Sequence, residues 1–349
     1  MRTIHGRKRQ NLQNSTILDE TENPLLDSQT SPRQRRVKQI WAIGGGKGGV
    51  GKSLLASSLA ISLSRAGHKV IAVDLDLGGA NLHTALGVGL PKQTLSDFIN
   101  TVDSNIQDCV VPSGIPRLDL ISGAHDSIGI ANINSTQKNH LLNHLKLLDA
   151  DYLVFDLGAG TSANTIDFFL YSDIGIITLL PEPTSIENGY RFIKSAYYQY
   201  LLNSPHLSNI RPLIKMAMET KNPLGIKSPT DLFREVNKSS PESAMKLKKA
   251  IEDFKLNLVV NETRTQTDIE IGNSIKTVCK KYFGMDIDYI GHLDYDSSVW
   301  QAVRRKRPLL LEFPNSKLAS GIEHIMQNII RHNALFNPHF LPLETNTPG

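Results

Sequence analysis

The amino-acid sequence predicts an α/β fold, a doubly wound and mostly parallel sheet with helices on both faces. From residue 39 onward, short apolar runs alternate with amphipathic stretches. The apolar runs lack the polar–apolar alternation of a half-exposed strand, which indicates strands covered on both sides. A glycine-rich segment follows the first apolar run and precedes a helical stretch, as in nucleotide-binding sheets. We expect one domain over residues 38–335.

The individual elements follow from the same pattern. Strands are expected at residues 39–43, 69–73, 118–121, 152–155, 174–180, 256–260 and 288–293. Helices are expected at residues 53–66, 138–148, 184–202 and 269–283, the first of them stopped by Gly67. The apolar spacing in residues 322–330 predicts a last helix packed on the sheet.

Residues 203–255 interrupt the alternation of strands and helices. They contain five prolines and then a lysine-rich helical stretch at residues 244–254. Because the strand–helix alternation resumes afterwards, we interpret this segment as an elaborated crossover between two strands and not as an independent domain.

Charge is concentrated near the beginning of the sequence. Residues 1–38 hold eight Lys/Arg and four Asp/Glu, so they carry the whole formal net charge of +4. Residues 1–37 are polar and aperiodic, which predicts a disordered basic leader, and residues 336–349 predict a flexible tail. The basic clusters at residues 7–9 and 33–36 suit either a solvated leader or contact with an anionic membrane or nucleic acid.

Targeting and redox features are few. No run of eighteen apolar residues and no secretory signal is found. Cys109 and Cys279 stand far apart with no CxxC spacing, which predicts buried thiols and a cytoplasmic location, with membrane or pole association left open. His83 and His125 lack partners at metal-ligand spacing, so non-metal roles are expected for both.

The segment at residues 46–53, GKGGVGKS, matches the phosphate-loop pattern G-x-x-x-x-G-K-[ST]. Glycines let successive backbone N–H groups point at phosphate oxygens, and the next helix adds its positive end. Lysine supplies charge to the terminal phosphates and the serine hydroxyl ligates Mg²⁺. The predicted nucleotide-binding residues here are Gly46, Lys47, Gly48, Gly49, Val50, Gly51, Lys52, Ser53 and Leu54.

A second lysine, Lys47, lies inside this loop, and KGGVGKS resembles the deviant Walker A motif of the MinD/ParA family. The resemblance implies an ATPase that forms a homodimer with ATP, in which Lys47 reaches the partner's nucleotide. A cation supplied in this way neutralises charge that develops during phosphoryl transfer. Lys47 and Lys52 are therefore predicted to be catalytic.

Two further strand ends carry the resemblance. Residues 73–81, VDLDLGGAN, resemble the family's switch I, which implies that Asp76 orients the attacking water and that Asp74 supports Mg²⁺. Residues 152–160, YLVFDLGAG, resemble its Walker B strand and switch II, which implies that Asp156 holds Mg²⁺ together with Ser53. The carboxyl ends of parallel strands meet at one edge of a sheet, where ligands bind.

Base recognition is predicted after a late strand. VVNETR at residues 259–264 lies where this family places an adenine-contacting asparagine, so Asn261 and Arg264 are candidates, with ordinary loop roles as the alternative. The guanine-reading sequence N-K-x-D does not occur, which favours ATP over GTP.

Residues 181–194 and 291–308 resemble the group of flagellar-number regulators called FlhG or FleN. This implies spatial control of flagella or another polar structure, with a protein effector that stimulates hydrolysis. The last residues, 338–349, show no membrane-targeting helix. Alternatives are a DNA-partitioning ATPase, for which the basic run 304–307 and the leader would bind DNA non-specifically, and a metabolic ATP-dependent ligase on the same scaffold.

Overall fold

The computed structural model describes residues 37–101, 104–123, 133–219, 221–226 and 228–336. The predicted leader, the predicted tail and His125 therefore lie outside the described residues, apart from Val37 and Phe336 at the edges. Two units are distinguished, residues 1–34 and 35–349, and the second contains all the described residues.

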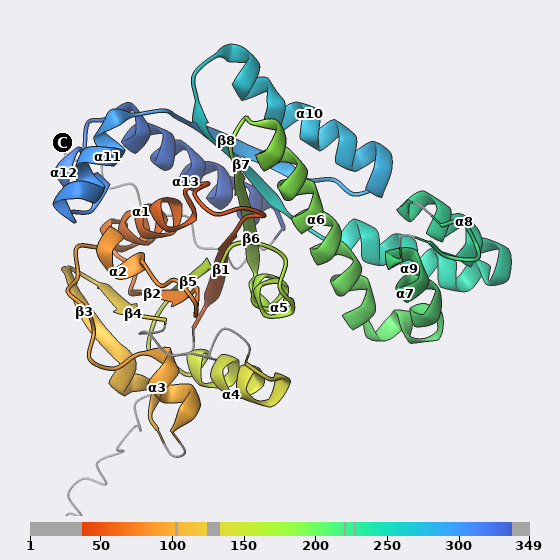
Figure 1. The fold of residues 1–349 in the computed structure, drawn as a ribbon, viewed down its shortest axis with the longest axis horizontal. Coiled ribbons are helices and arrows are strands. Elements are labelled where there is room, and N and C mark those ends of the chain that lie inside the picture. Colours follow the sequence, from red (N-terminus) through yellow and green to blue (C-terminus); the bar gives the residue numbers. More distant parts are fainter. Residues whose placement is uncertain (1–36, 102–103, 124–132, 220, 227, 337–349) are drawn as a thin grey trace, which may run out of the picture. The chain divides into compact units, whose positions relative to one another are not determined.

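An eight-stranded sheet organises this unit, with strand order β3-β4-β2-β5-β1-β6-β7-β8 (Figure 1). Within the described residues, seven strands are parallel and only β3 runs antiparallel, against β4. The strands are β1 (Gln39–Gly44), β2 (Val70–Leu75), β3 (Val110–Ile115), β4 (Leu118–Ile121), β5 (Tyr152–Leu157), β6 (Ile174–Leu179), β7 (Asn257–Thr263) and β8 (Asp288–Asp294). The predicted fold class is confirmed.

Helices connect the strands on both sides. They are α1 (Lys52–Arg65), α2 (Leu82–Ala85), α3 (Leu95–Asn100), α4 (Ser135–Leu145), α5 (Ala163–Tyr171), α6 (Pro183–Asn203), α7 (Arg211–Met218), α8 (Pro229–Ser239), α9 (Pro241–Asp253), α10 (Gln266–Phe283), α11 (Ser297–Arg305), α12 (Leu309–Glu312) and α13 (Lys317–Phe336). Two short 3₁₀ helices are η1 (Ile106–Cys109) and η2 (Pro205–Ile210).

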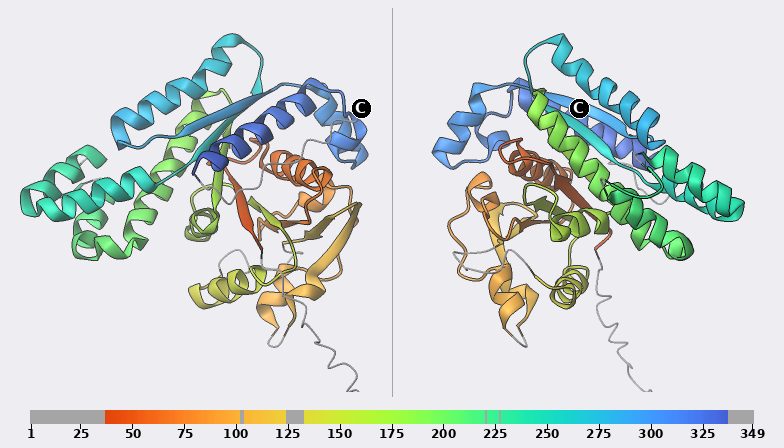
Figure 2. Two further views of the ribbon diagram at one scale, coloured as in Figure 1. Left: turned by 180° about the vertical axis from the view of Figure 1, so that it is seen from behind. Right: turned by 45° about the vertical axis from the view of Figure 1, so that its right-hand side comes forward.

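The two faces of the sheet are covered by different helices, as the two views in Figure 2 show. Along β1, Ile40 and Ala42 join a core with α4, α5, α6 and α10, whereas Trp41 and Ile43 join a core with α1, α12 and α13. Successive side chains of a strand point to opposite faces, so a run of apolar residues fills both layers.

Among the strands of the described sheet, β3 is the one that the sequence pattern did not predict. Its sequence, VVPSGI, includes Pro112 and Gly114, and its side chains are only partly buried. Proline cannot donate to a sheet ladder and is tolerated at edges, which is where β3 lies, beyond β4. The apolar periodicity that revealed the buried strands is therefore absent from this edge strand.

Residues 203–255 hold η2, α7, α8 and α9, which pack beside the far end of α6 before the chain enters β7 (Figure 1). Their apolar side chains, among them Leu207, Ile214 and Leu247, belong to the same core as α6 and β7. Both cysteines are buried free thiols.

A candidate nucleotide-binding site

The glycine-rich loop lies between the end of β1 and the first turn of α1, at the carboxyl edge of the sheet. Gly51 precedes α1 with φ 92°, a conformation that favours glycine. A Cβ at Gly51 would stand 2.2 Å from Nδ2 of Asn261, and one at Gly46 would stand 2.0 Å from the backbone oxygen of Asn188. Close approach of other backbone and side-chain atoms thus requires glycine at these two positions.

Two polar side chains fasten the loop to neighbouring strands. Asn261, at the end of β7, donates from Nδ2 to the carbonyl of Val50 at 3.1 Å, and Thr178 of β6 donates its hydroxyl to the same carbonyl at 3.3 Å. On the other side, the N–H of Gly160 donates to the carbonyl of Gly45 at 3.1 Å. The loop is therefore tied to β6, β7 and the turn after β5.

Lys52 lies inside the site, with only 8% of its surface exposed. Burial lowers its pKa, and the nearby carboxylates of Asp156 and Asp76 oppose that shift. Its ammonium is thus held in a poorly solvated position between acidic groups, where a charge acts more strongly than in water.

Asp74 and Asp156 are directly opposite each other on the paired strands β2 and β5, and both are buried. Burial, with a contribution from Asp76, raises the pKa of Asp74 to about 6, although its oxygens accept from the N–H groups of Asp76 and Leu82 at 3.1 and 2.9 Å. Burial and the charge of Asp74 raise the pKa of Asp156 to about 8, while the Ser53 hydroxyl and Lys52 lower it.

This arrangement fits a magnesium ion. Within the described residues, Oδ1 of Asp156 is buried without a hydrogen-bond partner, and the Ser53 hydroxyl bonds to the same carboxyl group. Two adjacent buried carboxyls with raised pKa values are stabilised by a cation between or beside them. No group of three or more His, Cys, Asp or Glu side chains in the described chain forms a metal site by itself, so water and phosphate oxygens would have to complete the coordination.

Asp76 is partly exposed at the mouth of the site. A Cβ at Gly158 would stand 3.3 Å from its carboxylate oxygen Oδ1, so Asp76 lies against the turn that follows β5. The structure thus brings the predicted residues Lys52, Ser53, Asp74, Asp76 and Asp156 together at one edge of the sheet.

Lys47 pairs with an acid that does not belong to this cluster. Its ammonium lies 3.7 Å from Oε2 of Glu182, the residue before α6, and both side chains are about half exposed. Glu182 was not singled out in the sequence, because its nearness to Lys47 depends on how β6 lies beside β1.

The predicted base contacts, Asn261 and Arg264, lie at the end of β7. Asn261 is buried, and its Nδ2 is engaged by the loop, whereas its Oδ1 has no partner among the described residues. Arg264 is exposed, and its guanidinium carbon lies 3.7 Å from the ring centroid of Tyr295. Sequence reasoning missed Tyr295, since only the β7–β8 pairing brings it to Arg264.

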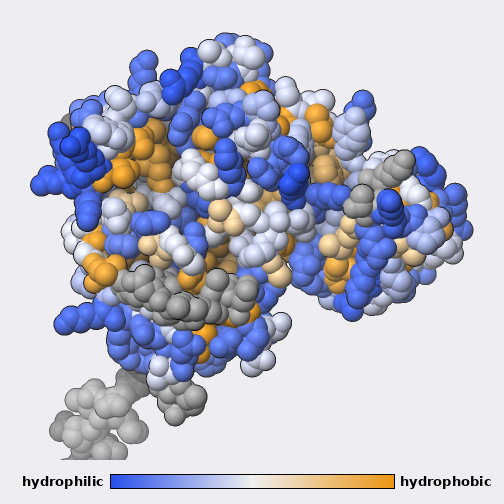
Figure 3. Space-filling model, viewed as in Figure 1, coloured by the Kyte–Doolittle hydropathy of each residue, from blue (hydrophilic) through white to orange (hydrophobic). Residues whose placement is uncertain are grey.

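A hollow of about 230 Å³ opens beside the first turn of α1, with a mostly apolar lining from α1, α2, α11 and α12. Ser53, Leu54 and Asn81 line it, together with Val299 and Val303. Apolar surface is visible in this part of Figure 3, at the upper left, with hydrophilic residues outside it. The predicted residue Leu54 thus borders a hollow next to the glycine-rich loop.

The other residues of interest take structural roles. Tyr197 and Tyr198 are almost completely buried, and Ile322, Ile325 and Ile329 of α13 pack under the sheet. Among the described residues, no helix combines the length and apolar character needed to span a membrane.

Comparison with known proteins agrees with this geometry. The model of the CobQ/CobB/MinD/ParA nucleotide binding domain matches residues 41–309. The antiactivator FleN of Pseudomonas aeruginosa is 26% identical over 302 residues, which cover 83% of this chain and 86% of FleN. The flagellum site-determining protein YlxH of Helicobacter pylori is 36% identical over 164 residues, but the match spans only 44% of this chain and 52% of YlxH.

Solved structures support the same fold. The septum site-determining protein MinD of Pyrococcus horikoshii, complexed with Mg-ADP, superposes with a TM-score of 0.57 at 20% identity, over 85% of this chain and 98% of that chain. The family model covers most of the present chain. The glycine-rich loop, the buried lysine and the paired aspartates of this chain lie at the carboxyl edge of a parallel sheet. The chain is therefore a member of the CobQ/CobB/MinD/ParA nucleotide-binding family.

Proposed function

We propose that this protein binds ATP with Mg²⁺, dimerises around the nucleotide and hydrolyses it to ADP and phosphate. The observation that supports this most directly is the buried Lys52 beside Asp156, whose carboxyl has an unpartnered buried oxygen. Such a site is costly in the absence of an anion and a cation that satisfy these groups.

In this proposal the loop at residues 46–53 binds the phosphates. In the described part of the chain, the N–H groups of Gly48, Gly49 and Gly51 donate to no other backbone carbonyl, so they are available to phosphate oxygens. Lys52 neutralises the terminal phosphates. Magnesium would supply charge neutralisation at the β- and γ-phosphates, held by Ser53 with Asp74 and Asp156.

Asp76 is proposed to orient the attacking water, because it lies at the mouth of the site close to the turn after β5. Lys47 is proposed to act in the partner's site, as its side chain is partly exposed and its ammonium forms a 3.7 Å ion pair with Glu182. An exposed pair of this kind is weak, so it can be exchanged for a nucleotide phosphate.

For the base, we propose that Oδ1 of Asn261 accepts from the adenine amino group and that Arg264 with Tyr295 offers a flat surface at the ends of β7 and β8. Stacked aromatic and guanidinium planes bind purine faces.

The proposed ATP-dependent dimerisation is tested on an Asp76→Ala variant. Light scattering after size exclusion, with and without Mg-ATP, measures its molar mass. This variant should form a dimer only with ATP, because it binds the nucleotide but hydrolyses it slowly. Lys52→Ala should lose ATP binding, and Lys47→Ala should bind ATP but lose dimerisation or hydrolysis. A dimer that forms equally without nucleotide would contradict the switch.

The cellular role we propose is spatial or numerical control of flagella, with a protein effector that stimulates hydrolysis, in the cytoplasm and at the membrane or pole. Similarity to FleN and YlxH supports it. Deletion of the gene should change the number or placement of flagella, as counted by electron microscopy. Wild-type flagellation in the deletion strain would contradict the flagellar role.

DNA partitioning is a second candidate, favoured by the exposed cations Arg304, Arg305, Lys306 and Arg307 at the end of α11. Salt-sensitive DNA binding that requires ATP would support it. Absence of such binding at low salt would remove it.

A further inference from the structure

Two neighbouring hollows lie on the surface beside α6 and α10. One, of about 440 Å³, is lined by α8, α9 and α10, and the other, of about 420 Å³, is lined by α6, α8 and α10. Pro229 and Phe283 belong to both linings, so the two hollows adjoin each other. We call the pair of hollows the α6–α10 groove.

Aromatic side chains form much of this groove. Tyr190, Tyr282 and the almost completely buried Tyr198 line one half, Phe233 lines the other, and Phe283 belongs to both linings. Tyr282 is 53% exposed. Aromatic groups that stay accessible in a concave surface are typical of protein recognition sites, because they bury a large area at a small entropic cost.

The rim of the groove has more positive than negative charges. Five cations line it, Arg191, Lys194, Lys248, Lys255 and Lys280, against three acids, Glu187, Glu252 and Asp286. Each acid forms an ion pair within the rim, with nitrogen–oxygen distances of 2.6 Å for Arg191–Glu187, 3.9 Å for Lys248–Glu252 and 2.5 Å for Lys280–Asp286. The difference, five minus three, leaves a surplus of two positive charges.

This charge pattern favours one class of occupant. A lining with a formal charge of +2 attracts an acidic segment. The two adjoining aromatic hollows, which share Phe283, suit two neighbouring apolar side chains of one peptide.

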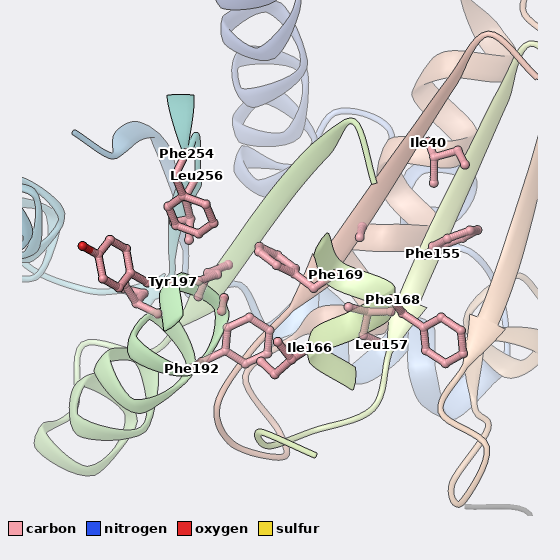
Figure 4. Packing of buried hydrophobic residues seen from close by; sticks show 14 of the residues in the cluster. Ile40, Phe155, Leu157, Ile166, Phe168, Phe169, Phe192, Tyr197, Phe254 and Leu256 are labelled. Atoms are coloured by element: carbon pink, nitrogen blue, oxygen red, sulfur yellow. The ribbon is translucent and has the colours of Figure 1, made fainter. Parts of the chain in front are cut away.

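Helix α6 connects the groove to the nucleotide site. Its groove residues, Glu187, Tyr190, Arg191, Lys194 and Tyr198, follow at helical spacing along one stripe. The opposite face of α6 is fixed in the core by residues that include Phe192 and Tyr197 (Figure 4).

At its first turns, α6 touches the glycine-rich loop directly. Glu182, which precedes the helix, pairs with Lys47, and the backbone of Asn188 leaves no room for a Cβ at Gly46. A displacement of the loop would therefore shift the first turns of the helix, where the groove wall begins at Glu187, next to Asn188.

We propose that the α6–α10 groove docks an acidic segment of a partner protein that carries two neighbouring apolar side chains, and that nucleotide at the glycine-rich loop alters its affinity through α6. The docking stands on the groove alone, whereas the coupling rests on the proposed function. Because coupling between two sites is reciprocal, the docked segment also alters the affinity for nucleotide.

A random 16-residue peptide library displayed on phage, selected against the full chain, tests the docking. Enriched peptides should contain several Asp or Glu and two nearby apolar residues. Their binding, measured by fluorescence polarisation, should weaken at least tenfold in Lys194→Glu and in Tyr282→Ala. Met245→Ala is the matched control, since Met245 is 74% exposed on α9 but does not line the groove; it should bind as the wild type does.

Two results would overturn the docking site: enriched peptides that bind both groove variants normally, or double-stranded DNA that displaces the peptides and needs Lys194. The coupling is tested separately with Mg-ATP and with Lys52→Ala. Mg-ATP should shift peptide affinity at least threefold in the wild type and not in Lys52→Ala. Unchanged affinity in a wild type that demonstrably binds ATP would disprove the coupling, whereas failure of the wild type to bind ATP would instead contradict the proposed function.

Discussion

Gly51 and Gly48 lie three positions apart in the same loop, but the structure constrains them differently. Gly51 combines φ 92° with a neighbouring amide, Nδ2 of Asn261, that would lie 2.2 Å from a Cβ. A Cβ at Gly48 would meet nothing within 4 Å. At the scale of single residues, a pattern match therefore conceals which glycines the fold requires.

Gly51→Ala should destabilise the protein by about 2 kcal/mol or more, because the backbone strain at Gly51 and the displacement of Asn261 both cost free energy. Gly48→Ala is the control and should unfold at the wild-type temperature. Thermal denaturation followed by circular dichroism gives both values. Equal melting temperatures for the two variants would show that the contact with Asn261 is unimportant.

Asp156→Asn should abolish magnesium binding without lowering the stability of the metal-free protein. Asp156 repels Asp74 across the paired strands, so removal of its charge should leave the metal-free protein as stable as the wild type or more stable, by up to about 1 kcal/mol. Addition of Mg-ADP should raise the melting temperature of the wild type but not that of the variant. An equal rise in both would exclude Asp156 from the metal site.

At the scale of elements, α13 shows how an amphipathic pattern is used. Ile322, Ile325, Met326 and Ile329 are at most 2% exposed and pack on the same side of the sheet as α1. The apolar face of this helix is thus occupied by the core and is not available to a membrane.

Ile325→Ala should lower the free energy of unfolding by about 3 kcal/mol, the usual cost of a cavity at a fully buried isoleucine. Urea denaturation measures this loss. Ser320→Ala, at an exposed position of the same helix, serves as the control and should change stability little. A small effect of Ile325→Ala would mean that α13 is loosely packed.

At the scale of the whole molecule, charge is distributed unevenly along the chain. The formal net charge is +4, and residues 1–36 contribute seven Lys/Arg and four Asp/Glu, a difference of +3. The remaining residues therefore carry only +1. Residues 1–36 should therefore contribute more to non-specific attraction to polyanions than the rest of the chain.

Removal of residues 1–36 should make the protein elute from heparin at a lower salt concentration, while ATP binding stays the same. Ion-exchange and heparin chromatography of both forms at pH 7 would measure this. Unchanged elution from heparin would assign the polyanion contact to the cations at residues 304–307 instead.

The predicted strands and most helices agree with the structure to within a few residues, because buried parallel strands and helices leave a strong periodic pattern. Residues 39–43, for example, form β1, which extends one residue further. β3 was missed, since a partly exposed edge strand with Pro112 lacks that pattern.

The sequence by itself determined which residues could hold a nucleotide, because the loop at residues 46–53 is continuous in the chain and its chemistry is local. Tertiary structure decided everything that depends on strand order. It placed Asp74 opposite Asp156, turned the amide of Asn261 toward Val50, and brought Glu182 to Lys47 and Tyr295 to Arg264. The members of these pairs lie on, or shortly after, separate strands, and only the packing of the sheet sets their distances.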